Sequence, residues 1–322
     1  MTPRDVARTN AEVRVWFGHP QALSLVPDDL TGVAFGLWDG RSFPPPQGSE
    51  GVEFYVAPFE LIPYAQVFDS LSNLRVVQLS TSGYNHVLPH IREGMTLCNA
   101  GGVHDDSVAE WVMTAILGVL RDIPAYARLQ QRRVVQRFEA RELRGSTVLL
   151  IGWGQIGMAV ERRLAPFGVS ILRVASSARA GVHGPGSLAD LLPQAQVVVI
   201  VAPLTPQTRG MVNSGFLSRM PDGALLVNAS RGEIVVQEDL LAELRTGRIG
   251  AAIDAATPDP LPDGHPLLAE PGLLYTPHVG GHTVHTLSRL YDLVGSQLRS
   301  YLRGAPLRHV VSLGGKATPR RP

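Results

Sequence analysis

The chain has 322 residues, enough for two domains of ordinary size, and 44% of them are hydrophobic. Its formal net charge of +1 and the lack of a long basic run argue against a nucleic-acid partner. The single cysteine, Cys98, excludes an internal disulfide, and no apolar run approaches the ~20 residues that span a bilayer. We therefore expect a cytoplasmic protein without a membrane partner.

Several short strands open the chain. The runs VRVWF (13–17), VEFYV (52–56) and RVVQL (75–79) are rich in β-branched and aromatic residues, which is typical of strands. A loop rich in proline and glycine separates the first two at residues 41–51. Residues 105–122 predict a mostly buried helix with acidic residues near its start.

A second series of strands follows, in which apolar residues run almost without interruption. Its members are TVLLI (147–151), SILRV (170–174), VVVIV (197–201), ALLVN (224–228), GAAID (250–254) and LLYT (273–276). Such runs are typical of strands that are buried on both faces of a parallel sheet. Helices are expected between them at 155–167 and 237–247, so the series predicts a doubly wound α/β sheet. A long amphipathic helix is expected over 282–304.

The segment VLLIGWGQIGMAV places three glycines between a predicted strand and a predicted helix. Gly152 would permit the tight turn, Gly154 would let backbone N–H groups approach a pyrophosphate, and Gly157 would let the helix pack on the strand. The start of the helix offers free N–H groups and partial positive charge to phosphates. The pattern predicts a dinucleotide cofactor, and an ordinary tight turn is the alternative.

The second strand of this unit ends without a carboxylate. Ala175 lies where an NAD-binding protein would be expected to carry an acid for the ribose, and no acid occurs between residues 161 and 190. Ser176, Ser177 and Arg179 follow instead. Hydroxyl groups and a guanidinium suit a ribose 2′-phosphate, because arginine makes bidentate, charge-assisted bonds to phosphate. The segment predicts that NADP(H) is favoured over NAD(H); the alternative is a solvated loop that accepts NAD.

Charged side chains follow three strands at their carboxyl ends, the edge where ligands of open α/β sheets bind. Arg231 could clamp a carboxylate and polarise a neighbouring carbonyl. His278 could pass a proton, because imidazole titrates near neutral pH. A carboxylate, with Asp254 and Asp259 as the candidates, could fix its tautomer. Each residue alone has a structural explanation, but together, downstream of a dinucleotide turn, they predict a catalytic site.

Seven segments carry a resemblance to a known family. They are LSTSGYNHV (79–87), NAGGVHDDSVAEWV (99–112), LRGSTVLLIGWGQIG (143–157), APLTPQTRGMVN (202–213), LLVNASRGEIV (225–235), DAATPDPLP (254–262) and TPHVGG (276–281). Over roughly residues 50–312 the chain resembles the D-isomer-specific 2-hydroxyacid dehydrogenases. The resemblance implies that the protein reduces a small 2-keto acid, of the glyoxylate or hydroxypyruvate type, to the D-2-hydroxy acid with NAD(P)H.

The resemblance also implies catalytic roles. Arg231 would bind the substrate carboxylate and carbonyl, and His278 would be the acid and base. Asp259 would be the acidic partner of His278, at a position where the family usually has Glu. Since Asp is one methylene shorter, this pairing requires the backbone to lie closer to the imidazole.

Binding residues follow from the same resemblance. The backbone of Ser82, Gly83 and Tyr84 would hold the substrate carboxylate as a short nest of N–H groups. The cofactor would contact Gly152, Gly154, Gln155, Ile156, Gly157, Ser176, Ser177, Arg179, Ala202, Pro203, Thr208, Ala229, Ser230, Asp254 and Gly280.

The architecture implied is a Rossmann-type doubly wound parallel sheet inserted into a smaller flavodoxin-like substrate domain. The cofactor domain is expected at residues 100–285 and the substrate domain at 1–99 plus 286–322, with hinges near Ala100 and His282. Closure would exclude water from the reaction. Because the region around 105–138 commonly forms the dimer contact in such proteins, a homodimer is expected.

Other hypotheses remain open. A phosphoglycerate dehydrogenase-like enzyme is one, and a non-catalytic, NAD(H)-sensing binding protein of the co-repressor type is another. The histidines of HVGGHTVH (278–285) could be read as metal ligands, but a turn separates them and we expect no metal. His282 is predicted to touch the edge of the substrate or cofactor; a solvated helix start is the alternative.

Overall fold

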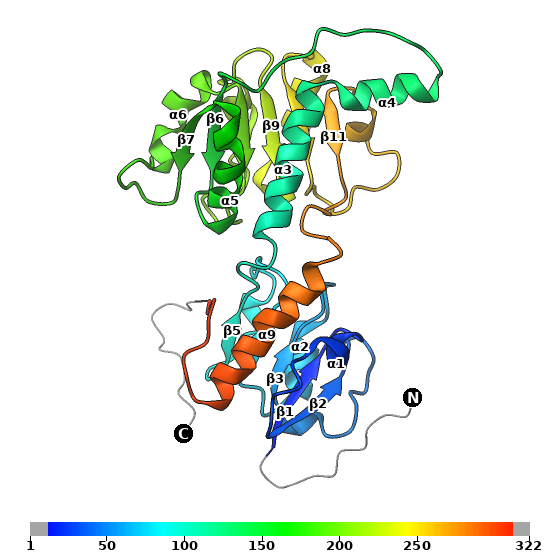
Figure 1. Ribbon diagram of the computed structural model, residues 1–322, viewed down its shortest axis with the longest axis vertical. Coiled ribbons are helices and arrows are strands. Elements are labelled where there is room, and N and C mark those ends of the chain that lie inside the picture. Colours follow the sequence, from blue (N-terminus) through cyan, green and yellow to red (C-terminus); the bar gives the residue numbers. More distant parts are fainter. Residues whose placement is uncertain (1–11, 312–322) are drawn as a thin grey trace. The chain divides into compact units, whose positions relative to one another are not determined.

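The computed structural model describes residues 12–311, which belong to two compact units (Figure 1). Of the described residues, 12–104 and 284–311 form what we call the terminal unit, and 105–283 form the central unit. The boundaries lie a few residues from the predicted 99/100 and 285/286. Residues 100–104 belong to the terminal unit because the Ala100 N–H donates to the Thr81 carbonyl (3.0 Å) and the His104 ring is hydrogen-bonded to the Ser80 carbonyl (2.8 Å).

The terminal unit is built on a parallel sheet with the strand order β2-β1-β3-β4-β5, the order of flavodoxin-like folds. Its strands are β1 (Val13–Phe17), β2 (Val33–Leu37), β3 (Val52–Val56), β4 (Val76–Gln78) and β5 (Thr96–Cys98). Its helices are α1 (Ala22–Leu25), α2 (Tyr64–Ser70) and α9 (Thr286–Leu302). The last of these begins four residues later than predicted, because the chain turns at His282, whose N–H donates to the Val279 carbonyl.

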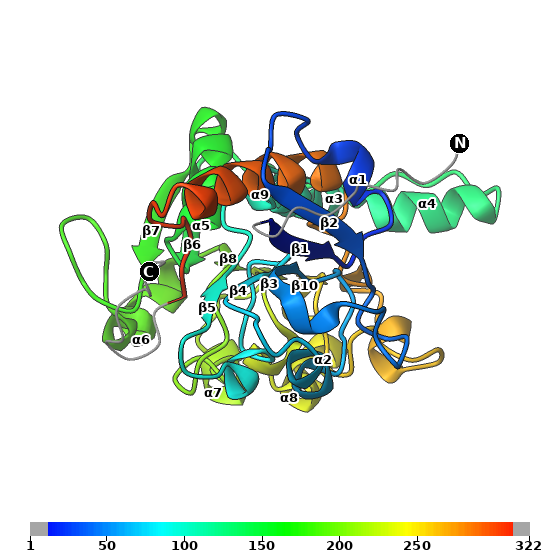
Figure 2. The same ribbon diagram turned by 90° about the horizontal axis from the view of Figure 1, so that it is seen from below.

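Helices cover both faces of this sheet, as Figure 2 shows for α9 and α2. Alternate residues of β1 serve the two sides: Phe17 packs in one core with Leu290 and Val294 of α9, and Trp16 packs in another with Phe68 of α2. A strand that is buried on both faces in this way needs apolar residues at successive positions, which is the pattern of the first strands.

The central unit contains a second parallel sheet, with the order β11-β10-β9-β8-β6-β7. Its strands are β6 (Thr147–Ile151), β7 (Ser170–Val174), β8 (Val197–Ile200), β9 (Leu225–Asn228), β10 (Gly250–Ile253) and β11 (Leu273–Tyr275). The direction in which strands are added reverses between β6 and β8. Ligands of doubly wound sheets bind at such a switch point, outside the carboxyl ends of the strands.

Helices again lie on both faces. They are α3 (Asp105–Leu120), α4 (Ile123–Gln131), α5 (Gln155–Leu164), α6 (Leu188–Leu191), α7 (Ser214–Leu217) and α8 (Gln237–Thr246). The helices α3 and α5 share a core with one face of the sheet, and α6, α7 and α8 share a core with the other (Figure 1). Within residues 12–311, none of the helices combines the length and the apolar character that crossing a membrane requires.

Candidate functional site

The turn between β6 and α5 has the shape that a bound pyrophosphate needs. Gly152 has φ +101°, and a Cβ atom there would collide with the backbone of Ala202. A Cβ atom on Gly157 would collide with the Gly152 carbonyl, so helix and strand can approach only because this residue is glycine. Beside Gly154, in contrast, the space is open. Free N–H groups at the start of α5 therefore face room for a phosphate, and the turn fits a dinucleotide.

The segment after β7 lies next to this turn. Residues 179–182 form a tight loop, closed by hydrogen bonds in both directions between the backbones of Arg179 and Val182 (2.9 and 2.8 Å). Ser176, Ser177 and Arg179 are exposed. The guanidinium of Arg179 lies 5.2 Å from the ring centroid of Trp153, which belongs to the glycine turn. The structure thus brings the predicted phosphate-binding turn and the predicted 2′-phosphate residues together.

Hydrogen bonds connect the neighbouring loops at the same edge of the sheet. The Ser230 hydroxyl, after β9, donates to the Ala202 carbonyl, after β8. Thr208 donates to the Pro203 carbonyl (2.7 Å), and the Ala229 N–H donates to the last residue of β8 (3.1 Å). The predicted cofactor residues after β8 and β9 therefore share one continuous edge with the glycine turn.

A buried carboxylate organises the turn that carries His278. Asp254, at the end of β10, is 4% exposed. One of its oxygens accepts from the Thr276 hydroxyl (2.6 Å) and the Val279 N–H (2.9 Å), and the other accepts from the Gly280 N–H (2.7 Å). These bonds hold His278 at φ +57°, a backbone conformation that costs energy in a residue other than glycine. Such strain persists only where the surroundings impose it.

The His278 imidazole is paired with Asp259. Its Nδ1 lies 2.5 Å from the Asp259 Oδ2, with the two side chains 44% and 31% exposed. The shorter acid thus reaches the ring, because the backbone of residues 257–261 is held close. Gln237 bonds both backbone polar groups of Thr257, and the Tyr275 hydroxyl accepts from the Leu261 N–H (2.9 Å). With Nδ1 engaged, Nε2 is the nitrogen left to exchange a proton.

Arg231 stands at the carboxyl end of β9, in a turn packed against the Asp259 segment. Its Nη1 donates to the Ser230 carbonyl (2.8 Å), and its own carbonyl accepts from Asn228 (3.1 Å). A Cβ atom on the next residue, Gly232, would collide with the backbone of Ala256, which shows how closely the two loops approach. Burial lowers the pKa of the Arg231 guanidinium, and the negative charges of Glu233 and Asp259 oppose this effect. The group stays charged and lies within electrostatic reach of the acid that pairs with His278.

The predicted substrate-binding backbone lies in the terminal unit, in the loop after β4. Asn99 donates to the Ser82 carbonyl (2.9 Å), and Thr81 donates to the Gly83 carbonyl (2.9 Å). Among the hydrogen bonds found between described residues, none uses the N–H groups of Ser82, Gly83 or Tyr84. In this loop the carbonyl oxygens of Ser82 and Gly83 accept hydrogen bonds, and the N–H groups of residues 82–84 make none of those found. Such N–H groups suit the predicted binding of a carboxylate.

Over residues 12–311, no group of three or more His, Cys, Asp or Glu side chains is placed so that it could hold a metal ion. His282 and His285 are both exposed. A contact of His282 with substrate or cofactor stays a prediction.

Several residues at these two sheet edges were not singled out from the sequence. Trp111 of α3 donates to the Thr276 hydroxyl (2.9 Å), which supports Asp254 in turn. In the terminal unit, His19 after β1 lies edge-on to Phe59 after β3, with ring centroids 4.7 Å apart. Burial lowers the pKa of His19 to about 4, so its ring is neutral. A lone histidine after a strand, or a lone tryptophan in a helix, carries no spacing pattern that could have identified it.

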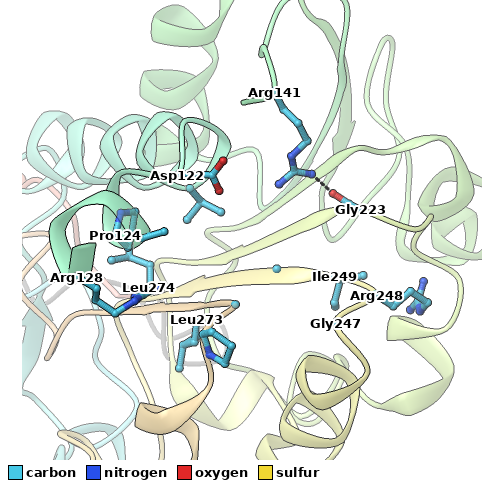
Figure 3. Close-up of a pocket in the computed structure, with 15 residues that line it drawn as sticks. Asp122, Pro124, Arg128, Arg141, Gly223, Gly247, Arg248, Ile249, Leu273 and Leu274 are labelled. Atoms are coloured by element: carbon cyan, nitrogen blue, oxygen red, sulfur yellow. Dashed lines mark hydrogen bonds between the residues drawn. The ribbon is translucent and has the colours of Figure 1, made fainter. Parts of the chain in front are cut away.

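A cavity of about 360 Å³ lies at the other edge of the central sheet (Figure 3). Its lining includes Gly223, just before β9, and residues at the start of β10 and β11. Arg141 extends to the Gly223 carbonyl there, as Figure 3 shows. Because these positions are the amino ends of the strands, the cavity is separate from the loops described above.

Comparison with known proteins agrees with this geometry. Residues 113–280 match the family model described as D-isomer specific 2-hydroxyacid dehydrogenase, NAD binding domain. A glyoxylate reductase/hydroxypyruvate reductase from Mus musculus is 32% identical in an alignment of 247 residues, which covers 72% of this chain and 75% of the relative. A glyoxylate reductase from Thermofilum pendens is 32% identical in an alignment of 255 residues, which covers 74% of this chain and 75% of the relative.

A solved structure is similar over nearly the whole chain. It is the NADPH-dependent glyoxylate/hydroxypyruvate reductase from Sinorhizobium meliloti in complex with NADP and sulfate, with a TM-score of 0.80 and 25% identity. The match covers 93% of this chain and 98% of that one. The chain belongs to the D-isomer specific 2-hydroxyacid dehydrogenase family and is an oxidoreductase.

Proposed function

We propose that this protein is a reductase of small 2-keto acids, of the glyoxylate and hydroxypyruvate type, that prefers NADPH. The observation that carries the proposal is the contact between His278 and Asp259 beside the charged Arg231, at the sheet edge that also holds the glycine turn. The names of the relatives from mouse, Thermofilum pendens and Sinorhizobium meliloti support the substrate class.

Each residue has a distinct task in this reaction. Arg231 binds the substrate carboxylate and polarises the carbonyl. When bound, the nicotinamide cofactor supplies the hydride that reduces the carbonyl carbon. His278 donates the proton to the carbonyl oxygen from Nε2, while Asp259 holds Nδ1 and stabilises the charged imidazole.

A spectrophotometric panel tests the proposal. Oxidation of NADPH and of NADH would be followed with glyoxylate, hydroxypyruvate, pyruvate and bulkier 2-keto acids. We expect the largest kcat/KM with the two small acids and NADPH. Turnover confined to phosphorylated substrates would instead favour the phosphoglycerate dehydrogenase hypothesis. Tight cofactor binding without turnover of any acid would favour an NAD(H)-sensing binding protein.

The preference for NADPH can be tested in a double variant. Arg179→Ala removes the guanidinium, and Ala175→Asp places an acid where it would repel a 2′-phosphate and bind the ribose hydroxyls. Because a hydrogen bond to a charged group contributes about 1.5–3 kcal/mol, we expect kcat/KM for NADPH to fall roughly 10- to 100-fold. The kcat/KM for NADH should stay the same or rise. Arg144→Ala, which removes an exposed arginine just before β6 at the other sheet edge, is the control. Unchanged preference in the double variant would refute the role of this segment.

A homodimer in the cytoplasm is also proposed. The region of α4 and the segment after it exposes apolar side chains, with Ile123 57%, Val134 49% and Val135 98% exposed. Burial of these apolar side chains against a second copy of the chain would favour a dimer. We expect light scattering to give twice the 34.7 kDa mass of one chain. Val135→Glu should shift that mass toward the monomer.

The cytoplasmic location is supported by the free, buried Cys98.

A further inference from the structure

Trp153 stands between the first two glycines of the cofactor turn, and its indole is only partly buried. Two cationic side chains lie over the ring: the Arg179 guanidinium carbon is 5.2 Å and the Arg173 guanidinium carbon 5.7 Å from the ring centroid. Separations under about 6 Å are those of cation–π interactions, in which the face of the ring attracts the charge.

The orientation of the indole is fixed by a pair of opposite charges. Its Nε1–H donates to the carboxylate of Glu161 on α5. The same carboxylate accepts two bonds from Arg173 on β7, one of them from Nε at 2.9 Å. The bond from Arg173 lowers the pKa of Glu161, so the acid is ionised and the two charges offset each other. This pair is part-buried, with side chains 29% and 21% exposed, so it holds the ring more firmly than a surface pair would.

Arg173 is paired with Glu161, whereas none of the ion pairs found within residues 12–311 includes Arg179. Its remaining contacts are long ones, 3.4 Å to the Trp153 carbonyl and 3.5 Å to the Ser177 carbonyl. The ring therefore positions the Arg179 guanidinium, while most of its N–H donors stay available. The exposed hydroxyls of Ser176 and Ser177 lie on the same segment.

We propose that Trp153 is a positioning residue that selects NADP(H), because its ring holds Arg179 where the 2′-phosphate binds. The inference rests on the proposed preference for NADPH, and it assigns part of that preference to Trp153 in the glycine turn between β6 and α5. A free arginine side chain loses rotamer freedom when it is ordered on a ligand. A ring that orders it in advance removes part of this cost from binding.

The test uses binding without turnover. Isothermal titration calorimetry would give the dissociation constants of 2′-phospho-ADP-ribose and ADP-ribose, two fragments that differ only in the 2′-phosphate. Trp153→Leu keeps an apolar side chain and removes the ring, and Trp153→Phe restores a ring without Nε1–H. We expect Trp153→Leu to weaken the phosphorylated fragment about three- to tenfold and to leave ADP-ribose within about twofold. Of the two arginines over the ring, Arg173 stays paired with Glu161, so the loss acts on the 2′-phosphate through Arg179. Trp153→Phe should recover more than half of the selectivity.

The outcomes separate this inference from the proposed function. If the unaltered protein binds the two fragments with equal constants, the preference for NADPH itself is wrong. If the constants differ and Arg179→Ala leaves their ratio unchanged, the roles of Arg179 and Trp153 are wrong. If Arg179→Ala lowers the ratio but Trp153→Leu does not, only the role of Trp153 is wrong. Equal losses of both fragments in Trp153→Leu would also overturn it, because the ring would then serve the turn as a whole.

Discussion

Replacing His278 by alanine is expected to lower kcat roughly 10²- to 10⁴-fold, the usual contribution of a general acid. The imidazole is held for proton transfer by the Asp259 contact at 2.5 Å and by a strained backbone that Asp254 enforces. Backbone strain at one residue lowers the stability of the folded protein, and it persists where it fixes the position of a functional side chain. Steady-state rates with NADPH and glyoxylate would measure the loss, and single-turnover rates would confirm that it lies in the chemical step.

Two controls make this result specific. The dissociation constant of 2′-phospho-ADP-ribose should stay within about twofold in His278→Ala, because the imidazole does not contribute to the glycine turn. Asp259→Asn should lower kcat less than His278→Ala, since it weakens the orientation and charge of the ring but leaves the ring in place. Asp263→Asn changes an exposed acid of the same loop and should have no effect. A His278→Ala variant that kept more than a tenth of the rate would exclude His278 as the proton donor.

The strands buried on both faces could be located from the sequence because nothing polar interrupts them. Residues 147–151 and 197–201 were predicted as strands, and the structure has β6 and β8 there. The strand β2 was not predicted: it is an edge strand whose fourth residue is glycine, and its residues are mostly half-buried. The helices α2, which has only seven residues, and α4, which contains Pro124, were not predicted either. Short or edge elements depend on tertiary packing, and their local pattern is weak.

The glycine turn was predictable in more detail than the charged residues. The spacing of Gly152, Gly154 and Gly157 fixes their roles, because each role follows from a missing Cβ atom. The pairing of His278 with Asp259 spans 19 residues and two loops, so only the resemblance to a family suggested it. Its feasibility with the shorter acid depended on how closely the 257–261 backbone approaches, which is a property of packing.

Contacts between side chains of three different elements could not be predicted from the sequence. The ring of Trp153, the acid of Glu161 and the guanidinium of Arg173 come from a turn, a helix and a strand. Each residue taken alone has an ordinary explanation as a surface side chain. What makes them a unit is that β6 and β7 are neighbours in register, with Leu150 opposite Arg173, and that α5 returns over them.

Replacing Arg231 by alanine should reduce both substrate binding and turnover. Two charge-assisted hydrogen bonds to a carboxylate and a carbonyl contribute about 1.5–3 kcal/mol each, so kcat/KM should fall roughly 10²- to 10⁴-fold. The site is suited to an arginine that keeps its charge while half-buried, because Asp259 and Glu233 oppose the effect of burial. A bond that strengthens as negative charge develops on the carbonyl oxygen lowers kcat as well as raising KM when it is lost.

Arg231→Lys separates the geometry from the charge. A lysine keeps the positive charge but has no planar pair of N–H donors, so it cannot hold the carboxylate and the carbonyl at once. We therefore expect it to recover less than a tenth of the lost kcat/KM, with KM restored more than kcat, in the same spectrophotometric assay. Arg245→Ala, on the exposed side of α8, is the matched control for loss of an arginine from this unit. If Arg231→Lys restored full turnover, the guanidinium would act as a simple charge, and the carbonyl would have to be polarised by another group.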